Sequence, residues 1–257
     1  MIRWRITPLW VLFTIVCGYG CAGLVPTPLE YQVHVQPVLP EGRGDMYVDR
    51  EDSSVVFSKE GAIIRVKLLS DDELNLRFPR SNDGRFVNPY SHAKKDPTKG
   101  YVPPRFTVFE MTIINETYAK IEFDPAKSIL STEKRQEFRY YDAGREGANP
   151  LGGNSFNKYY RIEAGRTGNE LQLNMERRGL INRSIYHRHR PVFKGDRRAG
   201  LLVFDPLPHE TRQIRLAVRE FVLSFDANGN PEETVDVMFE FNIDQQVVEV
   251  VGSGGGV

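Results

Sequence analysis

The sequence predicts an all-β protein folded as an antiparallel β-sandwich. Short runs of β-branched and aromatic residues alternate with polar residues along much of the chain, for example at residues 106–114. Turn-forming residues separate these runs at intervals of about ten positions, most clearly in the sequence DANGNP at residues 226–231. No long apolar pattern has the helical period. A chain of 257 residues, of which 40% are hydrophobic, can bury the core that such a fold needs.

The N-terminus has the pattern of a targeting segment. Two arginines precede an unbroken apolar run, LWVLFTIV, at residues 9–16. Gly20 then precedes Cys21. Small residues ahead of a cysteine resemble the lipobox of bacterial lipoproteins, in which the cysteine is lipidated and becomes the first residue, although the two positions before Gly20 depart from that pattern. We therefore expect residues 1–21 to be a signal peptide with a lipobox, and Cys21 to carry the lipid.

Two other fates of this segment stay open. Cleavage near Ala22 would secrete the domain without a lipid, and retention would leave a membrane anchor, for which a stretch of roughly 17 residues is short. If Cys21 is lipidated, the alanine that follows it resembles the sorting pattern of outer-membrane lipoproteins. The expected location is therefore the cell envelope, on an outer membrane and facing the periplasm.

Composition excludes several functional classes. Lysine plus arginine and aspartate plus glutamate number 34 each, so the protein has no net charge with which to attract nucleic acid. Both cysteines, Cys17 and Cys21, lie in the targeting segment. The rest of the chain therefore has no cysteine for a disulfide, a thiol nucleophile or a zinc site. Both tryptophans lie there too, which leaves none to stack on a sugar.

The first elements follow from composition and alternation. Residues 22–45 are rich in proline and glycine and predict a flexible tether, with an edge strand at residues 31–36. The folded body is expected at residues 46–250. It begins with strand-like runs at residues 54–58 and 62–69, which flank a Lys-Glu-Gly turn and predict a hairpin.

The next elements lead to the middle of the chain. Alternating apolar residues predict a strand at residues 74–78, and the polar residues 80–104 predict a loop of a length that is often functional. Residues 106–125 predict a central hairpin with its turn at Asn115.

The signals are weaker in the next part of the chain. Residues 131–141 fit a strand or a short helix, and residues 160–175 alternate around a Gly-Arg-Thr-Gly turn, as in a third hairpin. Residues 176–188 leave helix and strand open.

The last part of the chain has clear signals. Residues 199–204 predict a buried strand, and residues 213–225 and 234–243 flank the DANGNP turn and predict the last hairpin. Residues 251–257 are expected to be a disordered tail.

Two blocks of sequence carry a resemblance. They are FTVFEMTIINET at residues 106–117 and VFKGDRRAGLLVFDPLPHETRQIRLAV at residues 192–218. Together they resemble the immunoglobulin-like sandwiches of small bacterial envelope lipoproteins. The resemblance implies a fold and a compartment but no activity. Residues 131–190 have no counterpart in it and are expected to be a long insertion.

The charges of the chain are segregated. The segment from Arg177 to Arg198 contains eight lysines or arginines and one acid, whereas the segment from Glu220 to Glu249 contains eight acids and no base. Two solvated faces, paired in part with each other, explain this pattern most simply. The functional hypothesis is that the basic segment binds an anionic envelope protein, a lipid headgroup or a glycan phosphate. The predicted partner-binding residues are Arg177, Arg178, Arg183, Arg188, Arg190, Lys194, Arg197 and Arg198.

Two motifs resemble metal sites. His187 and His189 would lie on one face of a strand, but flanking arginines oppose a bound cation, so a solvated basic segment is the preferred interpretation. Asp226, Asn228 and Asn230 match the opening of a calcium loop, but a proline follows where that loop needs glycine. A tight turn uses the same side chains. We therefore expect no metal site.

Four tyrosines are interleaved with arginines at Tyr140, Tyr141, Tyr159 and Tyr160. Tyrosine and arginine are enriched in binding hot spots, so a contact surface is one interpretation. Half-buried strand residues are the preferred one.

No catalytic motif was found for a serine nucleophile, a zinc protease, a phosphate-binding loop or a dinucleotide. The prediction is therefore a non-enzymatic envelope lipoprotein that acts as a binding or structural module and needs no cofactor. The alternative is a carbohydrate-binding or carbohydrate-acting sandwich. A catalytic pair of carboxylates in such a protein, within about 10 Å, leaves no spacing to recognise in a sequence.

Overall fold

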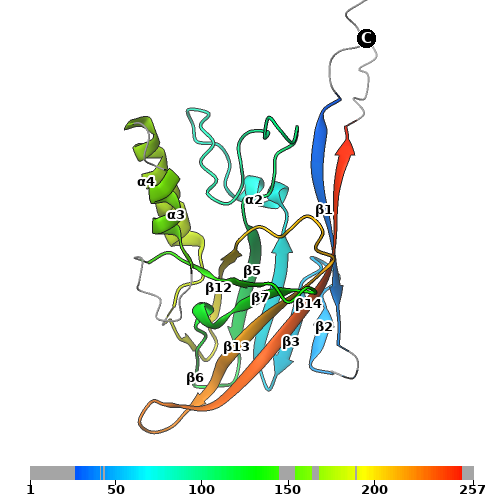
Figure 1. Cartoon of the computed structure of the whole chain (residues 1–257). Helices are drawn as coiled ribbons and strands as arrows, with labels where there is room; N and C mark the ends of the chain where they lie inside the picture. The colour runs from blue at the N-terminus through cyan, green and yellow to red at the C-terminus, as the bar shows by residue number, and fades with distance from the viewer. Residues whose placement is uncertain are drawn as a thin grey trace, which may run out of the picture.

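A computed structural model of the chain describes residues 27–40, 42, 44–144, 154–163, 168–188 and 190–250. These residues form two five-stranded antiparallel sheets (Figure 1). The first contains, in spatial order, β1 (Leu29–Val38), β14 (Pro231–Glu249), β13 (Gln213–Phe225), β7 (Ile129–Thr132) and β8 (Glu137–Arg139). The second contains β12 (Arg197–Phe204), β5 (Thr107–Asn115), β4 (Ala62–Leu69), β3 (Val55–Lys59) and β2 (Met46–Val48). The prediction of an all-β antiparallel sandwich is confirmed.

The two sheets share one apolar core. Phe109 of β5 contacts Phe204 of β12, with ring centroids 6.0 Å apart, and Phe241 of β14 in the other sheet, at 5.7 Å. All three rings are buried. Buried and partly exposed residues alternate along β4, as expected for a strand with one face in the core. Apolar contact between β5 and β14 therefore joins the sheets.

The other elements are short strands and helices. They are β6 (Lys120–Ile121), β9 (Tyr141–Asp142), β10 (Asn154–Ser155), β11 (Val192–Phe193), α2 (Asp71–Arg77), α3 (Phe156–Glu163), α4 (Gly168–Ser184) and the 3₁₀ helix η1 (Pro125–Lys127). β11 pairs with β6, and β10 pairs with β9. In Figure 1, α3, α4 and the loop between α2 and β5 lie toward the end of the sandwich where β1 begins. The β13–β14 turn lies at the other end.

Several sequence predictions are confirmed. β3 pairs with β4, and β13 pairs with β14, around the two expected turns. β1 pairs with β14 alone and forms an edge of the first sheet, as the alternating run at residues 31–36 predicted.

The predicted central hairpin at residues 106–125 is wrong. β5 pairs with β4 and β12, while β6 leaves the sheet and pairs with β11. The buried side chain of Asn115 explains this turn, because its Nδ2 donates to the carbonyl oxygens of Tyr118 and Val192, both at 2.9 Å. These bonds direct the chain out of the second sheet toward β11.

The predicted strand at residues 74–78 is also wrong, because residues 71–77 form the helix α2. The side chains and backbone N–H groups of Ser70 and Glu73 form a capping box, which starts a helix. Leu74 is buried whereas Leu76 is 82% exposed, so the alternation that suggested a strand does not describe two faces of a sheet.

The third hairpin is wrong as well. Residues 156–163 and 168–184 form α3 and α4, which also settles most of residues 176–188 as helix. Leucine, glutamate, glutamine, methionine and arginine dominate α4, and all favour helices. Residues 131–141 contribute to the strands β7, β8 and β9. The segment at residues 131–190 therefore supplies strands to the first sheet as well as both helices.

The predicted signal peptide, Cys21 and the predicted tail at residues 251–257 lie outside the described residues. Within the described part of the chain, no helix has the length and apolar character needed to cross a membrane.

Candidate functional site

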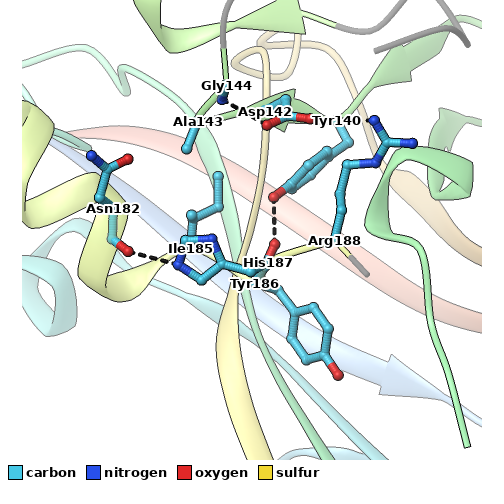
Figure 2. Close-up of a pocket in the computed structure, with 9 residues that line it drawn as sticks. All are labelled: Tyr140, Asp142, Ala143, Gly144, Asn182, Ile185, Tyr186, His187 and Arg188. Atoms are coloured by element: carbon cyan, nitrogen blue, oxygen red, sulfur yellow. Dashed lines mark hydrogen bonds and ion pairs between the residues drawn. The ribbon is translucent and has the colours of Figure 1, made fainter. Parts of the chain in front are cut away.

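A pocket of about 290 Å³ lies where the chain returns from α4 to the second sheet (Figure 2). Its walls come from β8–β9, the loop after β9, the end of α4 and the segment after α4. The lining residues are Tyr140, Asp142, Ala143, Gly144, Asn182, Ile185, Tyr186, His187 and Arg188.

Close backbone contact with β12 fixes the floor of this pocket. Ile185 forms a bridge with Leu201, and the N–H of Tyr186 donates to the carbonyl oxygen of Leu201 at 2.9 Å. A Cβ atom on Gly200 would lie 2.6 Å from the Cα of Tyr186, closer than van der Waals contact allows. A glycine is therefore needed for the segment after α4 to lie against β12.

A tyrosine holds the same segment from the other side. The hydroxyl of Tyr140 donates to the carbonyl oxygen of Tyr186 at 2.7 Å, as the dashed line in Figure 2 shows. Burial raises the pKa of Tyr140 well above its ordinary value, so the hydroxyl stays a neutral donor. The backbone at residues 185–186 is thus held between Tyr140 and β12.

Arg188 forms ion pairs with two carboxylates from distant parts of the chain. Its Nε and Nη2 donate to the two carboxylate oxygens of Asp124 at 2.8 and 2.9 Å. Its Nη1 lies 3.7 Å from Oδ2 of Asp142. The three side chains are only 14%, 17% and 16% exposed, in the order Arg188, Asp124, Asp142. The hydrogen bond to Asp124 raises the pKa of Arg188, and the charge of Asp142 adds to this effect.

Hydrogen bonds orient the other polar groups. Nε2 of His187 lies 2.7 Å from the carbonyl oxygen of Asn182. Because a carbonyl only accepts, Nε2 carries a proton that it donates to Asn182. Oδ1 of Asp142 accepts the N–H of Gly144 at 2.7 Å.

The pocket is lined by polar and ionisable side chains, among them Asp142, His187 and Arg188. None of its lining residues is a serine, threonine or cysteine that could act as a nucleophile. The described residues contain no group of three or more histidines, cysteines or carboxylates placed to hold a metal ion.

The structure does not gather the eight predicted partner-binding residues into one patch. Arg177, Arg178 and Arg183 lie on α4, whereas Arg197 of β12 pairs with Ile114 at the opposite end of β5. Arg188, between the two groups, is used in the internal ion pairs described above. The basic segment is therefore two separate groups of cations.

Three of the eight side chains reach into the fold. Arg188 forms the ion pairs described above, and Arg177 lies over the ring of Tyr160 and donates to the carbonyl oxygen of Phe86 at 3.4 Å. Nη1 of Arg198 is buried and has no hydrogen-bond partner among the described residues. The others are exposed and form no ion pair with any residue in the described ranges; they are Arg178, Arg183, Arg190, Lys194 and Arg197.

The acidic segment does not pair with the basic one within the described part of the chain. Its carboxylates pair with bases elsewhere, in the pairs Lys59–Glu233, Lys127–Glu220, Arg212–Asp244 and Arg215–Glu240. The partial pairing expected between the two segments is thus absent from those ranges.

The tyrosines with flanking arginines form no contact surface. Tyr140, Tyr141 and Tyr160 are buried, and Tyr141 contacts Phe106 and Phe156 at 5.1 Å between ring centroids. They belong to the core beneath α3.

The two metal-like motifs have different outcomes. His189 lies outside the described residues, and His187 belongs to the pocket. The carboxylate of Asp226 accepts the backbone N–H groups of Asn228 and Asn230, as the tight-turn interpretation predicted.

The loop at residues 80–104 lies against α4, which the sequence did not indicate. Arg85 pairs with Glu176 at 3.0 Å, and the hydroxyls of Tyr90 and Ser184 lie 2.6 Å apart. The hydroxyl of Tyr160 donates to the carbonyl oxygen of Pro89. The loop and the start of the basic segment, which were both singled out in the sequence, are therefore neighbours in the structure.

Sequence analysis also missed Asp124 and Asp142, and it named Tyr140 only as part of a possible contact surface. Asp124 and Arg188 are 64 residues apart, and Tyr140 and Tyr186 are 46 apart, so no local spacing links them.

Comparison with known proteins gives little guidance. No protein-family model matches the chain, and no curated protein matches it. Among solved structures, the chain is similar to the yjhA protein from Bacillus subtilis, with 13% sequence identity over 71% of this chain and 93% of that chain and a TM-score of 0.34. A likeness this distant carries no argument about function.

Proposed function

We propose that the protein is a non-enzymatic lipoprotein of the cell envelope whose sandwich binds an anionic protein partner. The binding surface is the cationic tip, which we define as Arg190, Phe193, Lys194 and Arg197, around the β11–β12 turn. The observation that carries the proposal is an exposed aromatic side chain among unpaired cations.

The tip has the composition of a protein-binding surface. Phe193 is 53% exposed, although phenylalanine is usually buried. The three cations around it are exposed and form no ion pair with the residues that the structure describes. Asp196 is the one acid in the same turn. An aromatic anchor surrounded by cations suits an acidic protein segment that also presents an apolar side chain.

The position of the tip agrees with a lipid anchor at Cys21. Cys21 and Leu29, where β1 begins, are eight residues apart, so they are separated by at most roughly 28 Å. The end of the sandwich where β1 begins would therefore lie close to the membrane. Gly195 donates to the carbonyl oxygen of Asn115, at the end of β5, which places the tip at the opposite end of the second sheet. From there it would reach partners in the periplasm.

The anchor is tested by the intact mass of the protein extracted from membranes of a bacterial host, before and after Cys21→Ala. A mass that fits cleavage before Cys21 plus acyl chains, lost in the variant together with membrane retention, is the expected result. An unmodified soluble form, or an uncleaved chain, would contradict lipidation.

The partner surface is tested by placing a photo-crosslinking amino acid at position 193 in those membranes. We expect a crosslinked species that disappears in Lys194→Glu/Arg197→Glu. It should persist in Arg178→Glu/Arg183→Glu, which makes the same charge change on α4. Equal loss in both variants, or no crosslink at all, would contradict the proposal. A crosslink to glycan in place of protein would mean that the partner is a glycan and that the proposed protein partner is wrong.

A further inference from the structure

The outer strands of the two sheets differ in how open they are to a further strand. β8 and β2 have only three residues each, and the segment after α4 covers part of β12 through the bridge between Ile185 and Leu201. β1 has ten residues, Leu29–Val38, and among the described residues it pairs with β14 alone. A long open edge is a template for pairing with another chain, and proteins usually shorten, cover or guard such edges.

The free edge of β1 has hydrogen-bonding groups to offer. Within the described ranges, the backbone of residues 29–38 forms hydrogen bonds only in its ladder with β14. Alternate residues of an antiparallel edge strand direct their N–H and C=O groups away from that ladder. In Figure 1, β1 and β14 run together along one margin of the molecule. Prolines, which have no N–H, stand at Pro28 and Pro37, so the stretch able to pair fully is residues 29–36.

The side chains of this stretch do little to guard the edge. Val33 and Val35 pack on the core, whereas Glu30, His34 and Gln36 are exposed on the opposite face. Lysine is a common guard of an edge strand, and residues 29–36 contain neither lysine nor arginine. Glu30 is the only acid in the stretch. Pairing with a further strand therefore brings little charge repulsion.

One register of antiparallel pairing suits a second copy of this chain. A two-fold axis at Gln32 places Glu30 of each copy opposite His34 of the other, so that two acid–histidine pairs form. His34 already faces Asp244 of its own chain, on β14. In the pair of strands His34 lies between two carboxylates, which can accept hydrogen bonds from its ring.

The neighbouring registers fit less well. The ladder centred on Gln32 leaves Pro37 outside. An axis one residue further on, at Val33, would bring Pro37 into the ladder and place Glu30 opposite an uncharged glutamine. An axis one residue earlier would also separate Glu30 from His34. The charges and the prolines of β1 therefore favour the same register.

We propose that the protein forms a dimer in which β1 pairs with β1 of a second copy, antiparallel and centred on Gln32. The first sheets of the two copies then form one continuous sheet. Each Leu29 lies opposite Val35 of the other copy, so the two copies of Leu29 are about 20 Å apart along the ladder. The lipid anchors proposed at Cys21 can therefore both reach one membrane, although the dimer does not depend on them.

Disulfide crosslinking of the purified protein under mild oxidation tests the register. Gln32→Cys places the two cysteines opposite each other, with Cα atoms about 4.5–5.5 Å apart, a separation that a disulfide spans. We expect a crosslinked dimer. Gln36→Cys lies on the same face of β1, but its two copies would be roughly 27 Å apart and should not crosslink. The unsubstituted chain controls for Cys17 and Cys21. No crosslink at position 32, or equal crosslinking at both positions, would overturn the proposal.

Sedimentation equilibrium of the purified protein measures the affinity of the dimer. Gln32→Lys places two lysines opposite each other at the axis and should raise the dissociation constant at least about fivefold. Gln246→Lys, at the neighbouring position on β14, is the matched control and should change the constant by less than about twofold. An unsubstituted chain that is monomeric at every concentration, or equal weakening by the two variants, would overturn the dimer.

Discussion

The sandwich and the helical layer are held together in different ways. In the sandwich, buried rings such as Phe109 and Phe241 meet across the two sheets. The helical layer, which we define as α3, α4 and the loop at residues 80–91, shares this core through buried rings such as Phe156, and it adds polar links of its own. The hydroxyls of Tyr90 and Tyr160 bond to Ser184 and Pro89, and Arg85 pairs with Glu176.

This difference has consequences for stability. Apolar burial is non-directional and tolerates small movements, whereas each hydrogen bond depends on geometry and contributes only about 1 kcal/mol net. We therefore expect the helical layer to open locally while the sandwich stays folded. The candidate pocket lies at the junction of the two regions, so its shape depends on how well the layer is attached.

The largest effect is expected in the sandwich core. Phe109→Ala removes a ring that contacts both sheets and should lower the free energy of unfolding by about 3–5 kcal/mol. Chemical denaturation followed by circular dichroism measures this. Leu76→Ala, at an 82% exposed position, should change it by less than about 0.5 kcal/mol. A small effect of Phe109→Ala would contradict the view that apolar contact joins the sheets.

The next effect concerns the junction. The Cβ of Gly200→Ala would meet the backbone of Tyr186, so either β12 or the segment after α4 must move. A loss of about 1–3 kcal/mol is expected, as for other overpacked sites. Hydrogen exchange should rise at residues 180–186 and stay unchanged in the β13–β14 pair. Uniform acceleration along the chain would mean that the two regions open together.

The same contrast explains what the sequence could predict. The pairs β3–β4 and β13–β14 join neighbouring runs through a tight turn, so local alternation and turn residues determine them. The partner of β5 depends on the buried side chain of Asn115, which acts through Val192, far away in sequence. Alternation within one run of residues carries no information about such a bond.

The site was predictable only in part. The cations of the basic segment were visible as a run of charge, but the ion pairs of Arg188 with Asp124 and Asp142, which remove it from that run, were not. α2 could have been found from its capping box, Ser70 and Glu73, which is a local signal. The pocket could not, because its walls come from parts of the chain more than 40 residues apart.

A smaller effect is expected from one bond inside the helical layer. Tyr90→Phe keeps the buried ring and removes the hydrogen bond to Ser184, which should cost about 1 kcal/mol. Exchange of the α4 amides should increase roughly fivefold, while the core strands stay protected. Tyr118→Phe is the matched control, because its hydroxyl bonds to Glu60 at an exposed position. Equal effects of the two variants would contradict a polar attachment of α4.

The smallest effect is a change of stability with pH. We assign it to the sandwich, because the group concerned lies in α2, outside the helical layer. Burial raises the pKa of Asp71, in the first turn of α2, from 3.8 to about 6, with a further contribution from Asp72. Because the folded state holds this proton more tightly than the unfolded state, the free energy of unfolding should fall as pH rises from about 4 to about 6. Asp71→Asn should therefore stabilise the protein at pH 7 by about 0.5–1 kcal/mol. This figure is below the full shift, because solvent screens a partly exposed group and the helix N-terminus favours the charge.

Thermal unfolding at pH 4 and pH 7 measures the difference, with the exposed Glu116→Gln as control. The gain should appear in the global transition and leave exchange within α4 unchanged. A gain at pH 4, or one confined to α4, would assign Asp71 to the helical layer and break the distinction between the two regions.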